Sequence, residues 1–244
     1  MKKIILLCVT AALLVSCKNL EKGSKYPDMV ADIDPYQVGS VNAFFDQPFS
    51  SKVKEAAVEV FFYPRENEVA LEFSYSTGQY RQFWSKEGRR LFTEALNRYK
   101  EDFANQNLST KTNKTRAVYG KVNSRFQWRT LKISSLYRAS PVIELGYRFR
   151  DDAPYLAARQ TKAKEESGKN NEGIKESPQY SIYFTRAQAE ELAAIFDQAF
   201  LLKSLEGKDI PAQTTDSGRD EYYQQNTARP EQPDTVPPEP EDDE

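Results

Sequence analysis

The fold prediction rests on two stretches, Tyr80-Arg-Gln-Phe-Trp-Ser85 and Tyr180-Ser-Ile-Tyr-Phe-Thr185. Each stretch has the composition of a strand, ends in a residue that caps helices well, and runs directly into a segment with helical spacing of apolar residues. The first helix is expected to turn its apolar positions inward at 91, 92, 95, 96, 99 and 103, and the second at Leu192, Ile195, Phe196, Ala199 and Phe200. The two stretches match at an offset of 100 residues without a gap, which predicts two copies of one strand-and-helix unit.

Strands are predicted upstream of each helix, because apolar and polar residues alternate there. The first half has candidate strands at 40–49, 58–63, 69–75 and 80–84, and the second at 122–130, 143–149, 155–163 and 180–184. Short connections such as 64–67 favour antiparallel hairpins. The sequence therefore predicts an α+β fold of two tandem antiparallel ββββα units, 37–110 and 111–205, packed with pseudo-twofold symmetry. The alternative is a lipocalin-like or other small β-barrel with helices.

The N-terminus carries an export pattern. Lys2 and Lys3 precede 12 mostly apolar residues, a run too short to span a bilayer core of about 30 Å. The run ends in Leu14-Val15-Ser16-Cys17, which resembles the lipobox of bacterial lipoproteins. This resemblance implies a signal peptide at 1–16 and a lipid-bearing Cys17, with fatty acyl chains such as palmitate holding the protein at the cell-envelope membrane. Lys18-Asn19 after the cysteine favours the outer membrane; an ordinary signal peptide with an incidental Cys17 is the alternative.

Polar segments flank the predicted body. Residues 17–36 have the composition of a tether, and residues 206–244 form an acidic, Pro-rich tail that is expected to be disordered. The tail has a net charge of −9, while residues 18–205 have a net charge of +5. The tail is interpreted either as a solvated end or as a segment that binds a partner or the basic body.

Composition excludes several kinds of catalysis. The chain has no His, and its two Cys lie within the first 17 residues, so His-based triads, structural zinc sites, disulfides and free thiol nucleophiles are not expected in the mature protein. The adjacent acidic pairs Asp151-Asp152, Glu190-Glu191 and Asp242-Asp243 do not by themselves make an acid–base site. We therefore expect no catalytic residue, no metal and no cofactor.

A candidate binding patch combines arginines with one aromatic residue: Arg125, Arg129, Arg148, Arg150 and Trp128. Alternation along a strand sends the aromatic side chains to the core and the arginines to solvent, which is the simpler interpretation. The other interpretation is a surface that binds an anionic glycan, a lipid headgroup, peptidoglycan or the acidic tail.

The predicted topology of residues 40–203 resembles tandem sheet-and-helix folds of the Whirly and PUR type, whose sheets bind single-stranded nucleic acid. That resemblance implies nucleic-acid binding only if the chain is not exported. The function predicted from the sequence is therefore a non-enzymatic, lipid-anchored binding or scaffolding module for a protein or an envelope polymer. Two alternatives are a carrier of an apolar ligand in an aromatic-lined cavity and a surface adhesin. The sequence makes no prediction of oligomeric state.

Overall fold

The computed structural model describes residues 26–46, 52–76, 78–109, 118–130, 133–150, 152–168 and 173–208, all within one compact unit that ends at Lys208. The lipobox with Cys17, most of the predicted tether and nearly all of the predicted tail lie outside the described residues. No helix within the described ranges combines the length and the apolar character needed to cross a bilayer.

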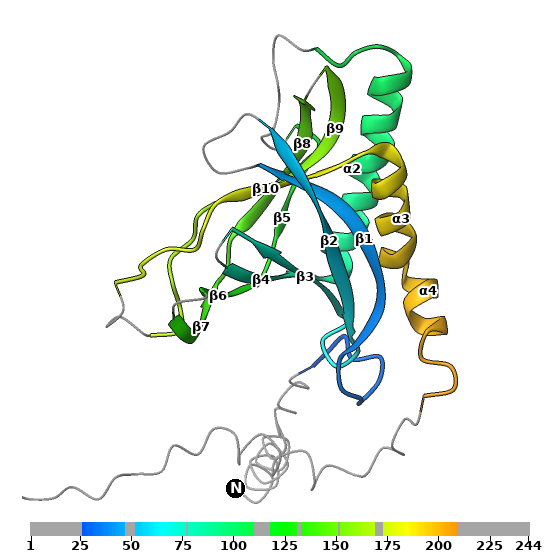
Figure 1. Cartoon of the computed structure of the whole chain (residues 1–244). Helices are drawn as coiled ribbons and strands as arrows, with labels where there is room; N and C mark the ends of the chain where they lie inside the picture. Colours follow the sequence, from blue (N-terminus) through cyan, green and yellow to red (C-terminus); the bar gives the residue numbers. More distant parts are fainter. Residues whose placement is uncertain are drawn as a thin grey trace, which may run out of the picture. The chain divides into compact units, whose positions relative to one another are not determined.

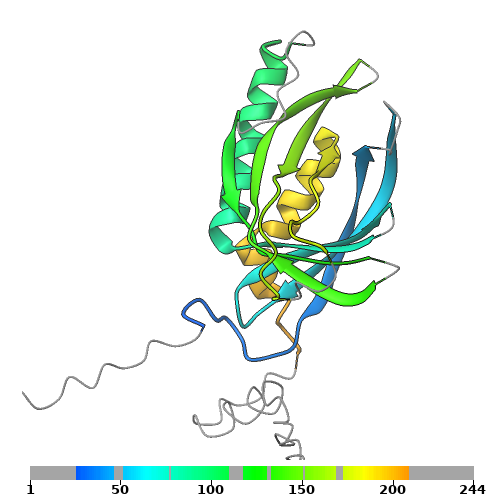
Figure 2. The ribbon, with the colours of Figure 1, turned by 90° about the vertical axis from the view of Figure 1, so that its left-hand side faces the viewer.

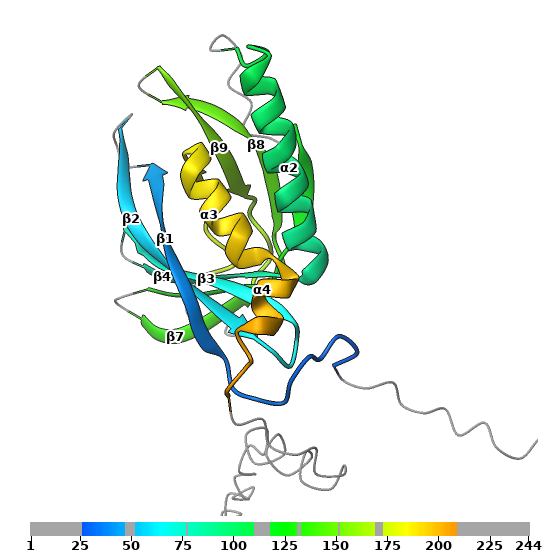
Figure 3. The same cartoon turned by 90° about the vertical axis from the view of Figure 1, so that its right-hand side faces the viewer.

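One antiparallel sheet organises the described residues, with the strand order β5-β8-β9-β10-β1-β2-β3-β4-β6-β7. The sheet curls around two helices, α2 and α3, which lie side by side against it (Figures 1 to 3). In chain order the elements are β1 (Tyr36–Asp46), β2 (Val53–Tyr63), β3 (Glu68–Tyr75), β4 (Gly78–Trp84), α2 (Lys86–Ala104), β5 (Gly120–Asn123), β6 (Phe126–Thr130), β7 (Ile133–Ala139), β8 (Val142–Arg150), β9 (Ala153–Gln160), β10 (Tyr180–Phe184), α3 (Arg186–Phe196) and α4 (Gln198–Lys203).

The predicted tandem of two ββββα units is wrong. β10 pairs with β1, so the last strand of the chain joins the first one instead of completing a sheet of its own. The barrel alternative is also not observed, because the two end strands of the order, β5 and β7, are not hydrogen-bonded to each other. The result is a single curled half-barrel sheet. Backbone pairing over a long sequence separation decided this, and local patterns carry no information about it.

A bent hairpin replaces one predicted strand and adds one that the sequence analysis missed. The predicted strand 122–130 is divided between β5 and β6. β5 pairs with β8 and β6 pairs with β7, and the register is continuous across the division, with Asn123 opposite Val142 and Phe126 opposite Ala139. Ser124 stabilises the bend, since its Oγ donates to the carbonyl of Phe83 at 2.8 Å. β6 then pairs with β4, while β8 pairs with β9. The chain itself thus connects the two ends of the sheet.

The helix starts are confirmed. Ser85 caps α2, with its side chain accepting from the backbone N–H of Gly88. Thr185 and Gln188 form a capping box at the start of α3. The inward face predicted for the second helix is partly wrong, because α3 ends at Phe196 and Asp197 caps the separate helix α4, which leaves Phe200 40% exposed.

The core under the helices is aromatic. Trp84 at the end of β4 packs against Phe92 of α2 and Phe196 of α3, with ring centroids 5.6 and 5.4 Å apart. Phe184, which matches Trp84 in the repeat, contacts Phe92 from β10 at 6.0 Å. The repeated strand-and-helix junctions therefore meet at one shared core, although the strands around them do not repeat.

A buried polar network links strands that are distant in the sequence. Gln82 Nε2 donates to Gln160 Oε1 at 3.2 Å and to the Tyr180 hydroxyl at 3.0 Å, and Trp84 Nε1 donates to Gln82 Oε1 at 3.2 Å. The Tyr180 hydroxyl in turn donates to Gln160 Oε1 at 2.9 Å. Both glutamines are fully buried. The network fixes β4 against β9 and β10 across the inside of the curl.

Candidate functional site

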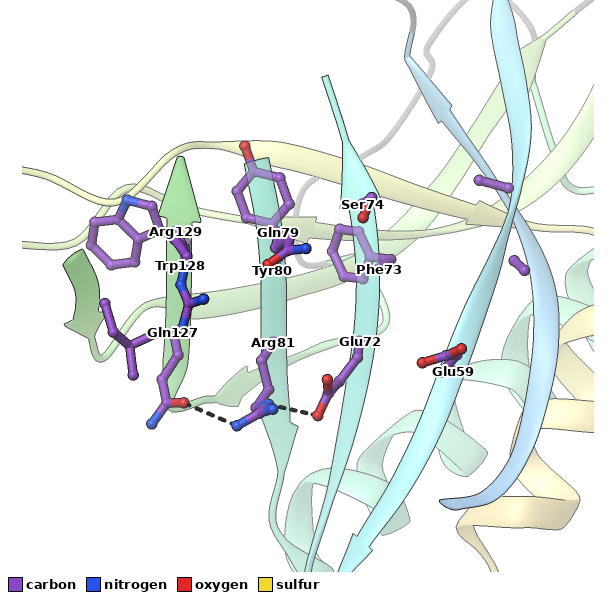
Figure 4. A pocket seen from close by; sticks show the side chains of 13 residues that line it. Glu59, Glu72, Phe73, Ser74, Gln79, Tyr80, Arg81, Gln127, Trp128 and Arg129 are labelled. Carbon is purple, nitrogen blue, oxygen red and sulfur yellow. Dashed lines mark hydrogen bonds and ion pairs between the residues drawn. The ribbon is translucent and has the colours of Figure 1, made fainter. Parts of the chain in front are cut away.

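A cleft of about 600 Å³ opens over the sheet between β2 and β7. Its lining comes from β2, β3, β4, β6 and β7, and includes polar, charged and aromatic side chains (Figure 4). Clefts of this size, with a few convergent polar groups, are typical of ligand-binding sites. We therefore take this cleft as the candidate site.

A row of planar polar side chains crosses the cleft from strand to strand. Glu59, Glu72, Arg81 and Gln127 stand opposite one another on β2, β3, β4 and β6. Arg81 Nε lies 2.6 Å from Glu72 Oε1, and Arg81 Nη1 donates to Gln127 Oε1 at 3.5 Å (Figure 4). The row presents carboxylate, guanidinium and amide groups whose spacing is fixed by the register of the sheet.

A second row lies beside the first. Ser74, Gln79 and Arg129 stand opposite one another on β3, β4 and β6, and all three residues are exposed. They add a hydroxyl, an amide and a guanidinium to the lining of the cleft. Exposed groups of this kind can exchange hydrogen bonds with water for hydrogen bonds with a ligand at little cost in desolvation.

Aromatic rings complete the lining. Phe73 and Trp128 are nearly buried, whereas Tyr80 is half-buried, and burial raises the pKa of the Tyr80 hydroxyl. Tyr80 stacks on Phe126 with ring centroids 5.9 Å apart, and Phe126 stacks on Trp128 at 5.4 Å. Tyr80 stands opposite Phe73 and Trp128 on the neighbouring strands, so the three rings share the inner face of the sheet, while the two polar rows lie on its other face.

The structure divides the predicted arginine patch into two places. Arg129 and Trp128 line the cleft, although Trp128 is only 3% exposed. Arg125 lies next to β6 but outside the cleft lining, where it forms an ion pair with Glu68 and covers the ring of Phe83 at 4.1 Å. Trp128 is buried and Arg125 and Arg129 are exposed, as the alternation predicted, whereas Arg148 and Arg150 are only partly exposed.

Arg148 and Arg150 belong to a different part of the sheet, on β8. Arg150 forms an ion pair with Asp46, and its guanidinium carbon lies 5.3 Å from the centre of the Tyr183 ring. Arg148 Nη1 donates to the Tyr183 hydroxyl at 3.3 Å, and that hydroxyl donates to Asp46 Oδ2 at 2.7 Å. These contacts join β8, β10 and β1, so the two arginines form a connection between strands and do not extend the cleft.

The sequence analysis missed most of the polar lining. Glu72, Gln79, Arg81 and Gln127 occupy alternate positions on three strands, and a prediction would have required knowing that β4 pairs with β6. The alternation of β3 and β4 was visible in the sequence, but the neighbour of β4 was not.

The acidic pairs singled out in the sequence do not form a site in the described ranges. Glu190 forms an ion pair with Lys100 Nζ at 2.5 Å, which connects α3 to α2. Asp151, Asp242 and Asp243 lie outside the described residues. Among the residues that the structure describes, no group of three or more Asp, Glu, His or Cys side chains is placed to hold a metal ion.

Comparison with known proteins gives a family and one relative. The family described as "Uncharacterised Treponema protein" matches residues 35–203, which is more than half of the chain. A protein of Treponema pallidum (strain Nichols), described as "Uncharacterized protein", is 23% identical over 206 residues, covering 84% of this chain and 70% of that protein. No solved structure matches.

Proposed function

This chain belongs to the family described as "Uncharacterised Treponema protein", and we propose that it is a lipid-anchored protein of the bacterial envelope that binds a glycan polymer without cleaving it. The lipobox sequence ending in Cys17 supports the location, with the outer membrane as the expected site. The cleft between β2 and β7 is the observation on which the binding proposal rests.

The chemistry of the cleft favours a ligand rich in hydroxyl groups. Two parallel rows of side chains offer donors and acceptors at intervals set by neighbouring strands, about 5 Å apart. Glu59 and Gln79 are exposed and Gln127 is half-buried, so they can bond a ligand that lies across the strands.

Binding without cleavage is proposed because of how the carboxylates of the cleft are placed. Glycoside hydrolysis needs one carboxyl group that donates a proton and a second that remains ionised. Glu59 and Glu72 stand opposite each other, but Glu72 is paired with Arg81 at 2.6 Å. Glu59, the other carboxylate of the lining, is exposed to water, so the cleft holds no enclosed pair of carboxyl groups on the two sides of a glycosidic bond.

A surface cleft is also better supported than an apolar carrier cavity. The rings inside the sheet pack on one another: Phe126 lies 5.8 Å from Tyr180, and Trp128 lies 5.4 Å from Tyr137. Rings in mutual contact fill a core densely and leave little internal space for a ligand.

The test is co-sedimentation of the mature chain with purified peptidoglycan sacculi and, separately, with an insoluble neutral polysaccharide. The double variant Gln79→Ala, Arg129→Ala should lose binding, because it removes two exposed groups of the cleft. Arg90→Ala is the matched control, since Arg90 is exposed on α2 and pairs with Glu87 and Glu94. Equal binding by the double variant and the control would contradict the proposal, and release of new reducing ends would contradict its non-enzymatic part.

A further inference from the structure

The start of β1 lies beside the C-terminal end of the described residues. The Tyr36 hydroxyl and Ser204 Oγ are 2.8 Å apart, and Lys208 Nζ lies 3.9 Å from the centre of the Tyr36 ring. Residues 26–35 run past the β2–β3 turn, where the backbone N–H of Val30 donates to the carbonyl of Pro64, and they enter β1 next to residues 204–208 (Figures 1 and 3). We refer to α4 and residues 204–208 as the α4 end.

The α4 end exposes apolar surface. Phe200 is 40% exposed and Leu202 is 45% exposed, and they are the large hydrophobic side chains that the described ranges leave exposed. Leu201 and Leu205 are buried and hold the segment on the body. Lys203 follows Leu202 in the chain and is exposed, and Glu206 and Lys208 are exposed in the same segment.

The anchor position restricts what this surface can meet. Eight residues separate Cys17 from Tyr26, the first described residue. Even when fully extended, this length of chain reaches only about 30 Å. A lipid on Cys17 would therefore keep the α4 end close to the bilayer and give it a high effective concentration there.

We propose that the α4 end docks on the lipid bilayer, with Phe200 and Leu202 entering the boundary between headgroups and acyl chains. This inference rests on the proposed lipid anchor at Cys17. Exposed apolar side chains next to a lysine, here Leu202 and Lys203, are used by interfacial segments, because the lysine stem extends along the apolar layer while its ammonium group stays among the headgroups. Docking would orient the body, with the C-terminal end of α2 directed away from the membrane.

A single-cysteine label can test the orientation on the lipidated chain. Apart from the lipid-bearing Cys17, the mature sequence contains no cysteine, so Leu202→Cys provides one reactive thiol for an environment-sensitive fluorophore. Phosphatidylcholine vesicles with brominated acyl chains should quench a label at position 202. Glu101→Cys, exposed near the C-terminal end of α2, is the matched control and should retain its fluorescence.

A second pair of chains tests the apolar side chains directly. A label at Lys203→Cys should be quenched in the otherwise unchanged chain, and it should lose that quenching when Phe200→Ser and Leu202→Ser are added. Flotation with the vesicles is measured in parallel. If both labelled chains float but the labels at positions 202 and 101 are quenched to the same extent, or neither is quenched, the docking surface is wrong and the lipid anchor is still supported. A lipidated chain that does not float would overturn both.

Discussion

At the scale of single residues, the fold depends on polar side chains that sit where apolar ones are expected. Gln82 and Gln160 are fully buried, and each satisfies its amide through the other and through Tyr180. A buried amide without partners is costly, so such a network specifies one arrangement of strands.

Gln82→Leu should lower the free energy of unfolding by about 2 to 4 kcal/mol, because Trp84 Nε1 loses its acceptor and the buried Gln160 and Tyr180 lose a donor. Gln79→Leu is the control on the same strand, because Gln79 is exposed. Urea unfolding curves measure both variants. Similar midpoints for the two would show that the network contributes little to stability.

Arg89 is the second buried polar residue of this kind. Only 2% of the Arg89 surface is exposed. Its guanidinium donates hydrogen bonds to the backbone carbonyls of Asn67, Trp84 and Phe196, and to the side chains of Asn67 and Gln198. Burial lowers the pKa of Arg89 to about 10. The residue connects the β2–β3 turn, the start of α2 and the junction of α3 with α4.

We expect Arg89→Met to destabilise the protein by about 3 kcal/mol or more, since several buried acceptors lose their donor at once. Arg89→Lys should not rescue it, because an ammonium group cannot reproduce the planar set of donors. The neighbouring exposed variant Arg90→Met should change the thermal midpoint little. A thermal midpoint for Arg89→Met equal to that of Arg90→Met would contradict this role.

At the scale of elements, the helix caps were the most predictable features. A cap involves only a few adjacent residues, so the sequence around Ser85 and Thr185 contains the whole interaction. The end of α3 was not predicted, because Asp197 could be recognised as a break only after the packing of Phe196 and Leu201 was known. The division of residues 122–130 at Ser124 was missed for the same reason.

Thr185→Ala should cost about 1 kcal/mol of stability, because the backbone N–H of Gln188 loses its acceptor and the capping box is broken. Thr185→Ser retains a hydroxyl at the same position and should stay close to the unchanged protein. Chemical denaturation of the three proteins gives the comparison. A loss as large for serine as for alanine would assign the effect to the methyl group and not to the cap.

At the scale of the whole described body, tyrosines fix the helices to the sheet. The Tyr99 hydroxyl of α2 donates to the carbonyl of Pro154 on β9 at 2.8 Å, and burial raises the pKa of Tyr99 to about 12 from a usual value of 10.0. Burial and the hydrogen bond to Asp102 also raise the pKa of Tyr119, and burial raises that of Tyr180.

The contribution of these tyrosines to the free energy of unfolding should therefore stay constant below pH 10 and should decrease as the pH rises from 10 towards 12. In that range the unfolded chain releases tyrosine protons that the folded chain retains, so ionisation favours unfolding. Tyr99→Phe should make the fall shallower, with a loss of about 1 kcal/mol near neutral pH from the missing hydrogen bond. Unfolding free energies measured in urea from pH 8 to pH 11 test this, and an unchanged slope in Tyr99→Phe would count against it.

The sequence by itself determined the local structure: most of the strands, both helix starts and their caps, and the solvent-facing positions of Arg125 and Arg129. These features depend on residues within a few positions of one another, where alternation, helical spacing and capping act. Tertiary structure alone decided that β10 pairs with β1 and that β4 pairs with β6. Because of these pairings, one curled sheet forms instead of the two predicted units. The pairing of β4 with β6 also completes the row of Glu59, Glu72, Arg81 and Gln127. The physical reason is that any strand can pair along its edge with many others, and the choice is made by how the buried side chains of the whole body fill a common interior.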